Sequence, residues 1–459
     1  MNVYLRAIDL GRSTCPWPEI ENGSPGYNPK FDFISEAKST PSLLIPAGED
    51  PSTVVQPTPQ EIPNPIPETT PEAAPNSEVP PQEISLEQRL SNAVQCVKDE
   101  KIDVITGGKA LEEKSLVWNK LNNTIALAVI EPKSSDEVSK AVSCLYNNGI
   151  RAVAKSGGHS YDGFSVLSDA VTISLNNMKN VMLNIDSTAV VQAGARLGDV
   201  YFEVNKQSKG KYAVVGGTCP AVGVGGHFLG GGTGMLSRMS GLACDQIKSL
   251  IMIDYKGDYI VADENQNSEL FWASCGGGGG NFGIVTEYTI KTTNIPDKVT
   301  TYFFAVKKGK LDYLEDIQAN VTKNASPLIS SIVVNIEPDT VEVQGLFLGP
   351  KANLNAALEE AGILKADIVD FSSKETTWIE STVQFAGYQA VKQPQDLTKI
   401  NLMESRYRTY FNLQSFYVLP NNPLPRKAFL DMLNWASDNP SGFIEIDILG
   451  PRVRMLWIK

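Results

Sequence analysis

Two histidines and a cysteine stand beside glycine clusters in the middle of the chain. His159 and His227 are its only histidines, and each directly follows a Gly-Gly pair. The first lies in Ser156-Gly-Gly-His-Ser-Tyr161, and the second ends Gly216-Gly-Thr-Cys-Pro-Ala-Val-Gly-Val-Gly-Gly-His227, which also contains Cys219. An imidazole nitrogen and a thiolate are side-chain nucleophiles that can attack an electrophilic carbon. These segments are therefore the first candidates for chemistry.

The glycines around these side chains indicate a ligand site. Glycine has no Cβ, so backbone N–H groups in such loops can approach a ligand closely, which favours a diphosphate. A further run, Gly230-Gly-Gly-Thr-Gly234, follows directly. A hydrogen-bonded turn histidine and a small buried cysteine are the ordinary interpretations of His159 and Cys219 taken singly. Together they predict a flavin site with two nucleophilic side chains, one of which could form a covalent tether, whereas His227 is interpreted as a support of its loop.

A pattern typical of dinucleotide-binding folds also occurs but fails its structural test. Gly278-x-Gly280-x-x-Gly283 matches G-x-G-x-x-G by letter. The residues after Gly283 are Ile-Val-Thr-Glu-Tyr-Thr-Ile, which favour a β-strand, whereas the motif requires a helix there. We interpret this segment as a tight entry into a strand close to a ligand.

Composition excludes several classes of function. The 459 residues allow two or three domains, and the net charge of −12 argues against nucleic-acid or anionic-membrane partners. No apolar run is long enough to predict a transmembrane span. Met1–Arg6 lacks the order of a signal peptide, so no export route is visible. Without a C-x-x-C pair, and with two histidines, no metal site is expected.

The chain divides by composition. Residues 1–83 hold more than half of the 28 prolines and are predicted to be a disordered N-terminal segment. Residues 84–294, with a core over 121–294, are predicted to form the ligand-binding domain. Residues 295–459, where alternating strands such as 329–336 and 341–347 appear, are predicted to form a second α+β domain.

Helix and strand signals explain how the first loop is positioned. Ser134-x-x-Glu137 is a capping box that opens a helix ending at Gly149. The apolar strand Ile150–Ala154 then leads to His159, and this order predicts an α/β arrangement. Other predicted elements of this domain are helices at 85–96, 197–207 and 268–273, and strands at 125–130, 171–175, 189–193, 251–255, 259–262 and 283–290.

Three segments resemble the berberine-bridge-enzyme-like flavoprotein oxidases. They are Lys155–Tyr161, Gly217–Gly232 and Leu270–Val285, and within the family they are most similar to fungal gluco- and chito-oligosaccharide oxidases. The resemblance covers about residues 85–450. It implies an α+β fold of the vanillyl-alcohol-oxidase type. A p-cresol-methylhydroxylase-type FAD-binding domain of two subdomains would be followed by a substrate domain of an antiparallel sheet and helices.

The resemblance also assigns roles to residues. His159 would carry the 8α bond to FAD and Cys219 the 6-S bond, so that the flavin is held twice. Tyr161 would face the substrate, and Val224 would lie where a small residue gives oxygen access to the ring. The residues implied to bind the cofactor, besides the two tethers, are Ser156, Gly157, Gly158, Ser160, Tyr161, Thr218, Val224, Gly225, Gly226, His227, Gly230, Gly231, Gly232, Gly283 and Ile284.

The remaining cysteines are partly explained by the resemblance. Cys96 and Cys144 match family positions that form a disulfide, worth about 4 kcal/mol by the chain-entropy estimate. Two buried free thiols are the alternative. Cys15, Cys244 and Cys275 have no assigned partners. Thr233 stands where sugar oxidases commonly have an aromatic residue, which would change the substrate pocket.

The end of the sequence limits the assignment of a catalytic base. The chain stops at Lys459, before the family's C-terminal segment, so the substrate domain is expected to be truncated and the base to lie beyond it. Besides Tyr161, the candidates for catalysis are Glu445 and Asp447 on the strand predicted at 442–448. Structural salt bridges are the alternative for both carboxylates.

The family's chemistry gives the expected reaction. A base would take a proton from the anomeric hydroxyl of a reducing-end sugar, and a hydride would pass from C1 to flavin N5, giving a lactone. Oxygen would then reoxidise the flavin and yield hydrogen peroxide. Oxidation of another alcohol in secondary metabolism, or flavin binding without activity in a truncated chain, are the alternatives. The family suggests an extracellular location.

Overall fold

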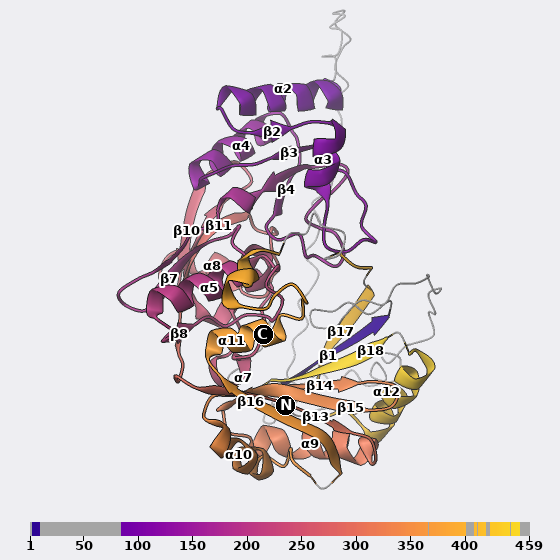
Figure 1. Cartoon of the computed structure of the whole chain (residues 1–459). Helices are drawn as coiled ribbons and strands as arrows, with labels where there is room; N and C mark the ends of the chain where they lie inside the picture. The colour runs from indigo at the N-terminus through magenta and orange to yellow at the C-terminus, as the bar shows by residue number, and fades with distance from the viewer. Residues whose placement is uncertain are drawn as a thin grey trace, which may run out of the picture. The chain divides into compact units, whose positions relative to one another are not determined.

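The computed structural model describes residues 2–9, 84–365, 367–400, 408–410, 412–418, 423–440 and 442–449. Three main sheets organise them (Figure 1). The described residues from Leu86 onward, together with the strand at residues 2–9, belong to one compact unit.

The last strand of the first sheet leads directly into the His159 loop. Its strand order is β2-β3-β5-β4, with β3, β5 and β4 parallel and β2 antiparallel at the edge. The elements of this region are α2 (Leu86–Asp99), β2 (Val104–Ile105), α3 (Gly108–Ser115), β3 (Ala128–Ile130), α4 (Ser135–Asn147), β4 (Ala152–Lys155) and β5 (Val171–Ser174). The predicted capping box is present at α4, where the Ser134 side chain accepts a hydrogen bond from the Glu137 N–H.

The second sheet is antiparallel and has the order β10-β9-β11-β7-β6. Its elements are β6 (Val181–Leu183), β7 (Thr188–Gln192), β9 (Ile247–Ile253), β10 (Tyr259–Asp263) and β11 (Ile284–Lys291). The strands predicted at 251–255 and 259–262 correspond to β9 and β10, which pair antiparallel. Strand β11 begins at Ile284, so the rejection of the dinucleotide pattern at Gly278–Gly283 is confirmed.

Short elements connect this sheet to the glycine-rich segments. They are α5 (Leu197–Ser208), β8 (Tyr212–Ala213), α6 (Val224–Leu229), α7 (Ser237–Ser240), η3 (Cys244–Gln246), α8 (Ser268–Ser274) and β12 (Thr293–Asn294). The core around them is continuous and includes the fully buried Phe228 and Tyr288, whose rings meet edge to face.

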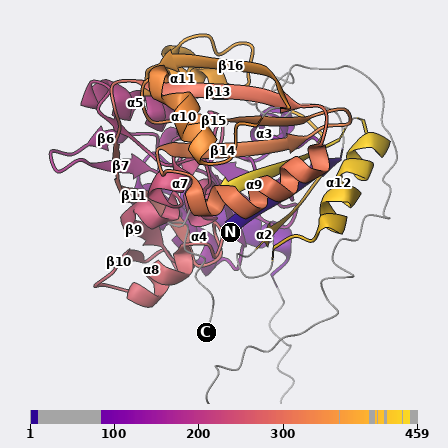
Figure 2. The ribbon, with the colours of Figure 1, turned by 90° about the horizontal axis from the view of Figure 1, so that it is seen from below.

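A seven-stranded antiparallel sheet forms the rest, in the order β16-β13-β15-β14-β18-β1-β17. Its strands are β1 (Asn2–Asp9), β13 (Val299–Val306), β14 (Ile329–Ile336), β15 (Val341–Phe347), β16 (Ile368–Thr376), β17 (Asn412–Val418) and β18 (Phe443–Leu449). The helices that accompany it are α9 (Lys310–Asn324), α10 (Leu354–Glu360), α11 (Trp378–Phe385) and α12 (Arg426–Asp438). Helices α9 and α12 lie on one face of the sheet (Figure 2).

The prediction that residues 1–83 are disordered is wrong for β1. This strand pairs antiparallel with β17 on one side and β18 on the other. Both partners lie more than 400 residues away in sequence, so local composition gives no sign of the pairing. Residues 10–83 lie outside the described part of the chain.

Candidate functional site

Both predicted loops line one cavity of about 550 Å³. This volume is within the range of small-molecule and cofactor sites. Most of the residues implied to bind the cofactor line it: Ser156, Gly157, Gly158, His159, Ser160, Tyr161, Thr218, Cys219, Gly225, Gly226, His227, Gly230, Gly232 and Gly283. Val224, Gly231 and Ile284 are outside this lining. The tertiary structure thus brings together segments that are about sixty residues apart in the sequence.

The two glycine loops contact each other directly through their backbones. A Cβ on Gly157 would lie 2.2 Å from the Gly223 nitrogen, and one on Gly223 would lie 2.1 Å from the Gly157 nitrogen. Neither position has room for a side chain. Ser156 adds a second link, because its hydroxyl donates to the Ala193 carbonyl at 2.6 Å and accepts from the Gly225 N–H at 3.3 Å. These glycines are required by loop-to-loop packing, in addition to any ligand.

His159 lies half-buried against an aromatic ring. The imidazole stacks on Trp118 with ring centroids 5.2 Å apart and planes 19° apart. Its Nε2 is out of contact with solvent and has no hydrogen-bond partner among the described residues. Burial, reinforced by the positive charge of Arg196, lowers the pKa of His159 to about 3. The imidazole is therefore neutral near pH 7, which is the form that can act as a nucleophile.

Cys219 is the free cysteine of the described residues. It is half-buried and lines the cavity. Tyr201 lies beside it, and the Tyr201 hydroxyl donates to the Gly217 carbonyl at 2.7 Å. Burial, and then the proximity of Cys219, raise the pKa of Tyr201, so this phenol stays neutral and fixes the loop that carries the cysteine.

His227 supports its loop, as predicted. Its Nε2 accepts a hydrogen bond from the Gly217 N–H at 3.0 Å. The side chain thereby joins the end of the loop to a residue two positions before Cys219. This arrangement gives His227 a positioning function at the wall of the cavity.

Two asparagine side chains from an earlier segment of the chain hold the loop that carries Tyr161. The Tyr161 carbonyl accepts hydrogen bonds from the side-chain amides of Asn119 and Asn122, at 2.9 and 2.8 Å. The residue is 36% exposed, and its ring lies tilted against that of Trp118.

Sequence reasoning did not find Trp118 or Arg196. Trp118 lies 41 residues before His159, in a segment without a recognisable motif. Arg196 precedes α5, where its backbone N–H donates to the Asp199 carboxylate and its guanidinium donates to the Ile400 carbonyl. No local sequence signal indicates the contact of Trp118 with His159 or that of Arg196 with Ile400, because each joins distant segments.

Glu445 and Asp447 are not part of the cavity lining. Strand β18 pairs them with Asn335 and Val333 of β14. Ile446 aligns with Phe304 across the sheet, and Phe304 packs edge to face on Tyr313 of α9. Side chains alternate along a strand, so both carboxylates belong to the face of the sheet opposite α9.

Val224, predicted to lie where oxygen reaches the ring, is outside the cavity lining. It is 0% exposed, and its N–H donates to the Ala195 carbonyl at 3.0 Å at the start of α6. The residue after it, Gly225, is the one that reaches the cavity wall.

A second cavity of about 800 Å³ lies elsewhere, between β16, α11 and the segment 387–394. Its wall includes Glu380, whose pKa is lowered to about 2. The cause is hydrogen bonding from the Thr377 N–H and from the Thr376 and Thr377 hydroxyls. Glu380 is therefore occupied in capping α11, and the wall contains none of the predicted site residues.

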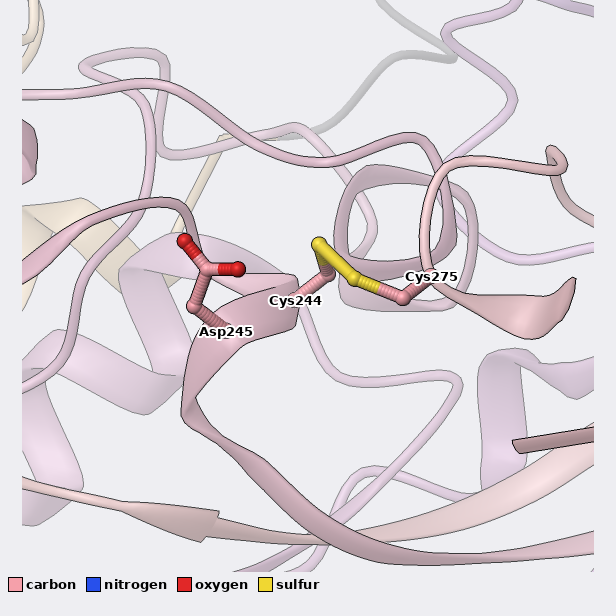
Figure 3. Close-up of side chains that lie close together, drawn as sticks. All are labelled: Cys244, Asp245 and Cys275. Carbon is pink, nitrogen blue, oxygen red and sulfur yellow. A yellow bond between two sulfur atoms is a disulfide. The ribbon is translucent and has the colours of Figure 1, made fainter. Parts of the chain in front are cut away.

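Two disulfides are present in the described chain. The predicted Cys96–Cys144 bond is confirmed and joins α2 to α4. Cys244 and Cys275, which sequence reasoning left without partners, form the second (Figure 3). Their pairing depends on two turns that meet only in the folded chain, with Cα atoms 5.4 Å apart.

Comparisons with known proteins agree with this geometry. Residues 126–263 match the family model described as an FAD binding domain. Berberine bridge enzyme-like D-1 of Nicotiana tabacum is 32% identical and aligns with 70% of this chain and 59% of its own length. Reticuline oxidase of Eschscholzia californica is also 32% identical, over 70% of this chain and 60% of its own. The chain thus spans about three fifths of these relatives.

A solved structure shows the same fold. The xylooligosaccharide oxidase from Myceliophthora thermophila C1, in complex with xylobiose, is 26% identical with a TM-score of 0.66. The likeness covers 79% of this chain and 76% of that one. Within the described residues, no helix combines the length and apolar character needed to cross a membrane.

The cavity fits FAD. Gly226 and Gly280 line it, and a Cβ built on either would meet no described atom within 4 Å, so backbone faces open space at both positions. The partnerless Nε2 of His159 and the free Cys219 place two candidate nucleophiles in the lining of the same cavity. A flat ring system with an attached diphosphate matches such a combination of bare backbone and two reactive side chains.

Proposed function

The matched part of the chain belongs to the berberine-bridge-enzyme-like family of FAD-linked proteins, and we propose that the protein is an FAD-dependent oxidase acting on an alcohol. Its fold is the α+β type with the p-cresol-methylhydroxylase-type FAD-binding domain that the sequence predicted. The preferred substrate in this proposal is the C1 hydroxyl of an oligosaccharide, and oxygen is the electron acceptor.

One observation carries the proposal. His159 and Cys219 come from separate loops and line the same glycine-walled cavity. A neutral imidazole with a partnerless nitrogen and a free thiol are the two groups needed for a double covalent attachment. We therefore assign the 8α link to His159 and the 6-S link to Cys219.

The chain's own residues would position the cofactor and the substrate. FAD, when bound, supplies the hydride acceptor and returns the electrons to oxygen. Trp118 fixes the ring plane of His159, and His227 fixes the Cys219 loop. Tyr161, half in solvent at the cavity wall, would contact the substrate.

We assign the proton acceptor to acidic side chains on one face of the seven-stranded sheet. Glu445 and Asp447 lie next but one to each other on β18 and are only partly buried. They are the acidic residues that we assign to this function, on the sheet face opposite α9. E445Q and D447N test this assignment. Loss of the proton acceptor should change the pH profile of kcat, whereas loss of a carboxylate with only a structural function should not.

The relatives support a carbohydrate or another alcohol. The xylooligosaccharide oxidase is named for a sugar substrate and holds xylobiose, whereas the plant relative is named as a reticuline oxidase. Thr233 lines the cavity where sugar oxidases commonly have an aromatic residue, which keeps another alcohol as the second candidate. Two disulfides support an oxidising, extracellular location.

Acid precipitation tests the cofactor assignment. The wild-type pellet should be yellow because a covalent flavin stays with the denatured protein. H159A and C219A should each keep flavin through the remaining bond, and H159A/C219A should release it into the supernatant. A colourless wild-type pellet from protein that contained flavin would refute covalent attachment.

Peroxide release tests the substrate. Flavin-loaded protein should produce hydrogen peroxide with at least one of cellobiose, xylobiose or chitobiose, and none when the reducing end is converted to the alditol. Turnover of benzylic or alkaloid alcohols alone would favour the second candidate. Covalent flavin without turnover on either set would leave a flavoprotein without oxidase activity.

A further inference from the structure

The second disulfide joins two segments of the cavity wall. Cys244 begins η3, ten residues after Gly234, the last glycine of the run that starts at Gly230. Cys275 follows α8 and begins the segment Gly276–Gly280. Gly230, Gly232, Gly279 and Gly280 all line the cavity. The disulfide therefore directly precedes the second glycine segment in sequence, whereas the folded chain brings it to the first.

Hydrogen bonds extend this link to the wall itself. The Cys244 N–H donates to the Gly231 carbonyl at 2.9 Å, and the preceding Ala243 N–H donates to Gly232 at 2.9 Å. On the other side, the N–H groups of Gly276 and Gly278 donate to the Leu229 carbonyl at 2.8 and 3.3 Å. The segment Leu229–Gly232 thus lies between the two cysteine-bearing segments, and the disulfide closes the arrangement covalently.

Besides the bonds to Leu229, the segment Gly276–Gly280 accepts a hydrogen bond at its Gly277 carbonyl from the Asn281 side-chain amide at 2.6 Å, and Gly279 lies close to Gly226. Gly276, Gly278 and Gly280 have φ angles of 99°, 87° and 84°, which glycine adopts without strain. A Cβ at Gly276 or Gly280 would meet no described atom within 4 Å. Ordering several glycines costs more conformational entropy than ordering other residues. A covalent anchor at the start of the segment offsets that cost.

A metal site is the competing interpretation of this cluster. Cys244, Asp245 and Cys275 place one ligand atom each within 4.8 Å of the others (Figure 3). The Asp245 carboxylate accepts a hydrogen bond from the Leu242 N–H at 2.7 Å, so it already has a structural function. A structural zinc site also needs four ligands, mostly thiolates and imidazoles. The bonded sulfurs favour the disulfide.

We propose that the Cys244–Cys275 disulfide positions the cofactor: it fixes the Gly230–Gly232 and Gly276–Gly280 walls of the cavity, and flavin affinity depends on it. This inference rests on the proposed FAD site. The Cys96–Cys144 bond is the natural control, because it closes a loop of similar length, 48 against 31 residues. It joins α2 to α4, and no residue of these helices is in the described lining of the cavity.

The test compares two double variants in a background that cannot bind flavin covalently. Full-length H159A/C219A is combined with C244S/C275S or with C96S/C144S, and FAD is titrated by flavin fluorescence and visible circular dichroism. The dissociation constant for FAD should rise at least tenfold with C244S/C275S and change less than twofold with C96S/C144S. If both cysteine-pair variants change the dissociation constant for FAD equally, the second disulfide only stabilises the fold and the proposal is wrong.

Two further measurements keep the outcome decisive. If C244S/C275S does not fold, the H159A/C219A protein is treated with graded dithiothreitol, and FAD release should follow reduction of Cys244–Cys275, mapped by alkylation and mass spectrometry. Release that follows Cys96–Cys144 instead would contradict the proposal, as would one zinc per chain bound at Cys244 and Cys275. Absence of FAD binding in the unreduced background and in wild type would refute the proposed function itself.

Discussion

At the scale of single residues, burial decides what His159 can do. Stacking on Trp118 and the loss of solvent around Nε2 favour the neutral imidazole, and the charge of Arg196 acts in the same direction. An exposed histidine would be largely protonated below its usual pKa of about 6.5. Here the nucleophilic form persists to a much lower pH.

This gives a pH prediction for flavin attachment. With a pKa near 3, His159 stays neutral from pH 5 to 8, so the rate at which flavin-free C219A becomes covalently labelled by added FAD should be nearly constant over that range. The measurement is acid-precipitable flavin against time at each pH. A rate that falls about tenfold per pH unit below pH 6.5 would show that the imidazole titrates normally.

At the scale of elements, two glycines with different surroundings allow effects on stability to be distinguished from effects on FAD binding. Gly157 contacts the backbone of Gly223, whereas Gly226 lies in α6 and faces open cavity. The same substitution, glycine to alanine, therefore has different consequences at the two positions. Gly157 is needed for the packing of the two loops, whereas Gly226 leaves space for the ligand.

G157A should destabilise the protein by about 3 kcal/mol or more, because its Cβ would overlap the backbone of the neighbouring loop. G226A should keep or raise stability by about 0.5–1 kcal/mol, since alanine favours a helix, but should weaken FAD binding because its methyl group enters the cavity. Urea unfolding measures the stability of each variant, and FAD titration in the H159A/C219A background measures its affinity. An unchanged FAD affinity in G226A would contradict the prediction that FAD lies against Gly226.

At the scale of the whole molecule, the two disulfides crosslink the FAD-binding region at different sites. Both close loops of tens of residues, and the chain-entropy estimate gives about 4 kcal/mol for each. The Cys96–Cys144 bond joins two helices that pack on each other beside the first sheet. The other bond lies beside the cavity.

Removing the first disulfide should therefore cost stability alone. C96S/C144S is expected to lower the free energy of unfolding by about 4 kcal/mol, measured by urea denaturation at neutral pH, while the flavin spectrum of the folded protein stays that of wild type. A changed flavin spectrum at unchanged stability would mean that α2 and α4 act on the cavity.

The sequence alone identified the loops that line the cavity, the hydrogen-bonding function of His227 and the first disulfide. Glycine patterns, capping boxes and alternating strands are local signals, and the boundaries of β14 and β15 follow from them. The family motifs are also local, because the residues that hold a flavin lie within short continuous segments. The FAD-binding region was therefore predictable from the printed residues.

Only the tertiary structure decided the contacts that join distant segments. Trp118 on His159, Gly157 against Gly223, the Cys244–Cys275 bond and β1 between β17 and β18 all pair residues whose neighbours in sequence show nothing of the partner. It also removed Val224 from the cavity wall, because α6 turns that side chain into the core. Such contacts follow from packing and from backbone pairing across the fold, which residue patterns along one segment do not encode.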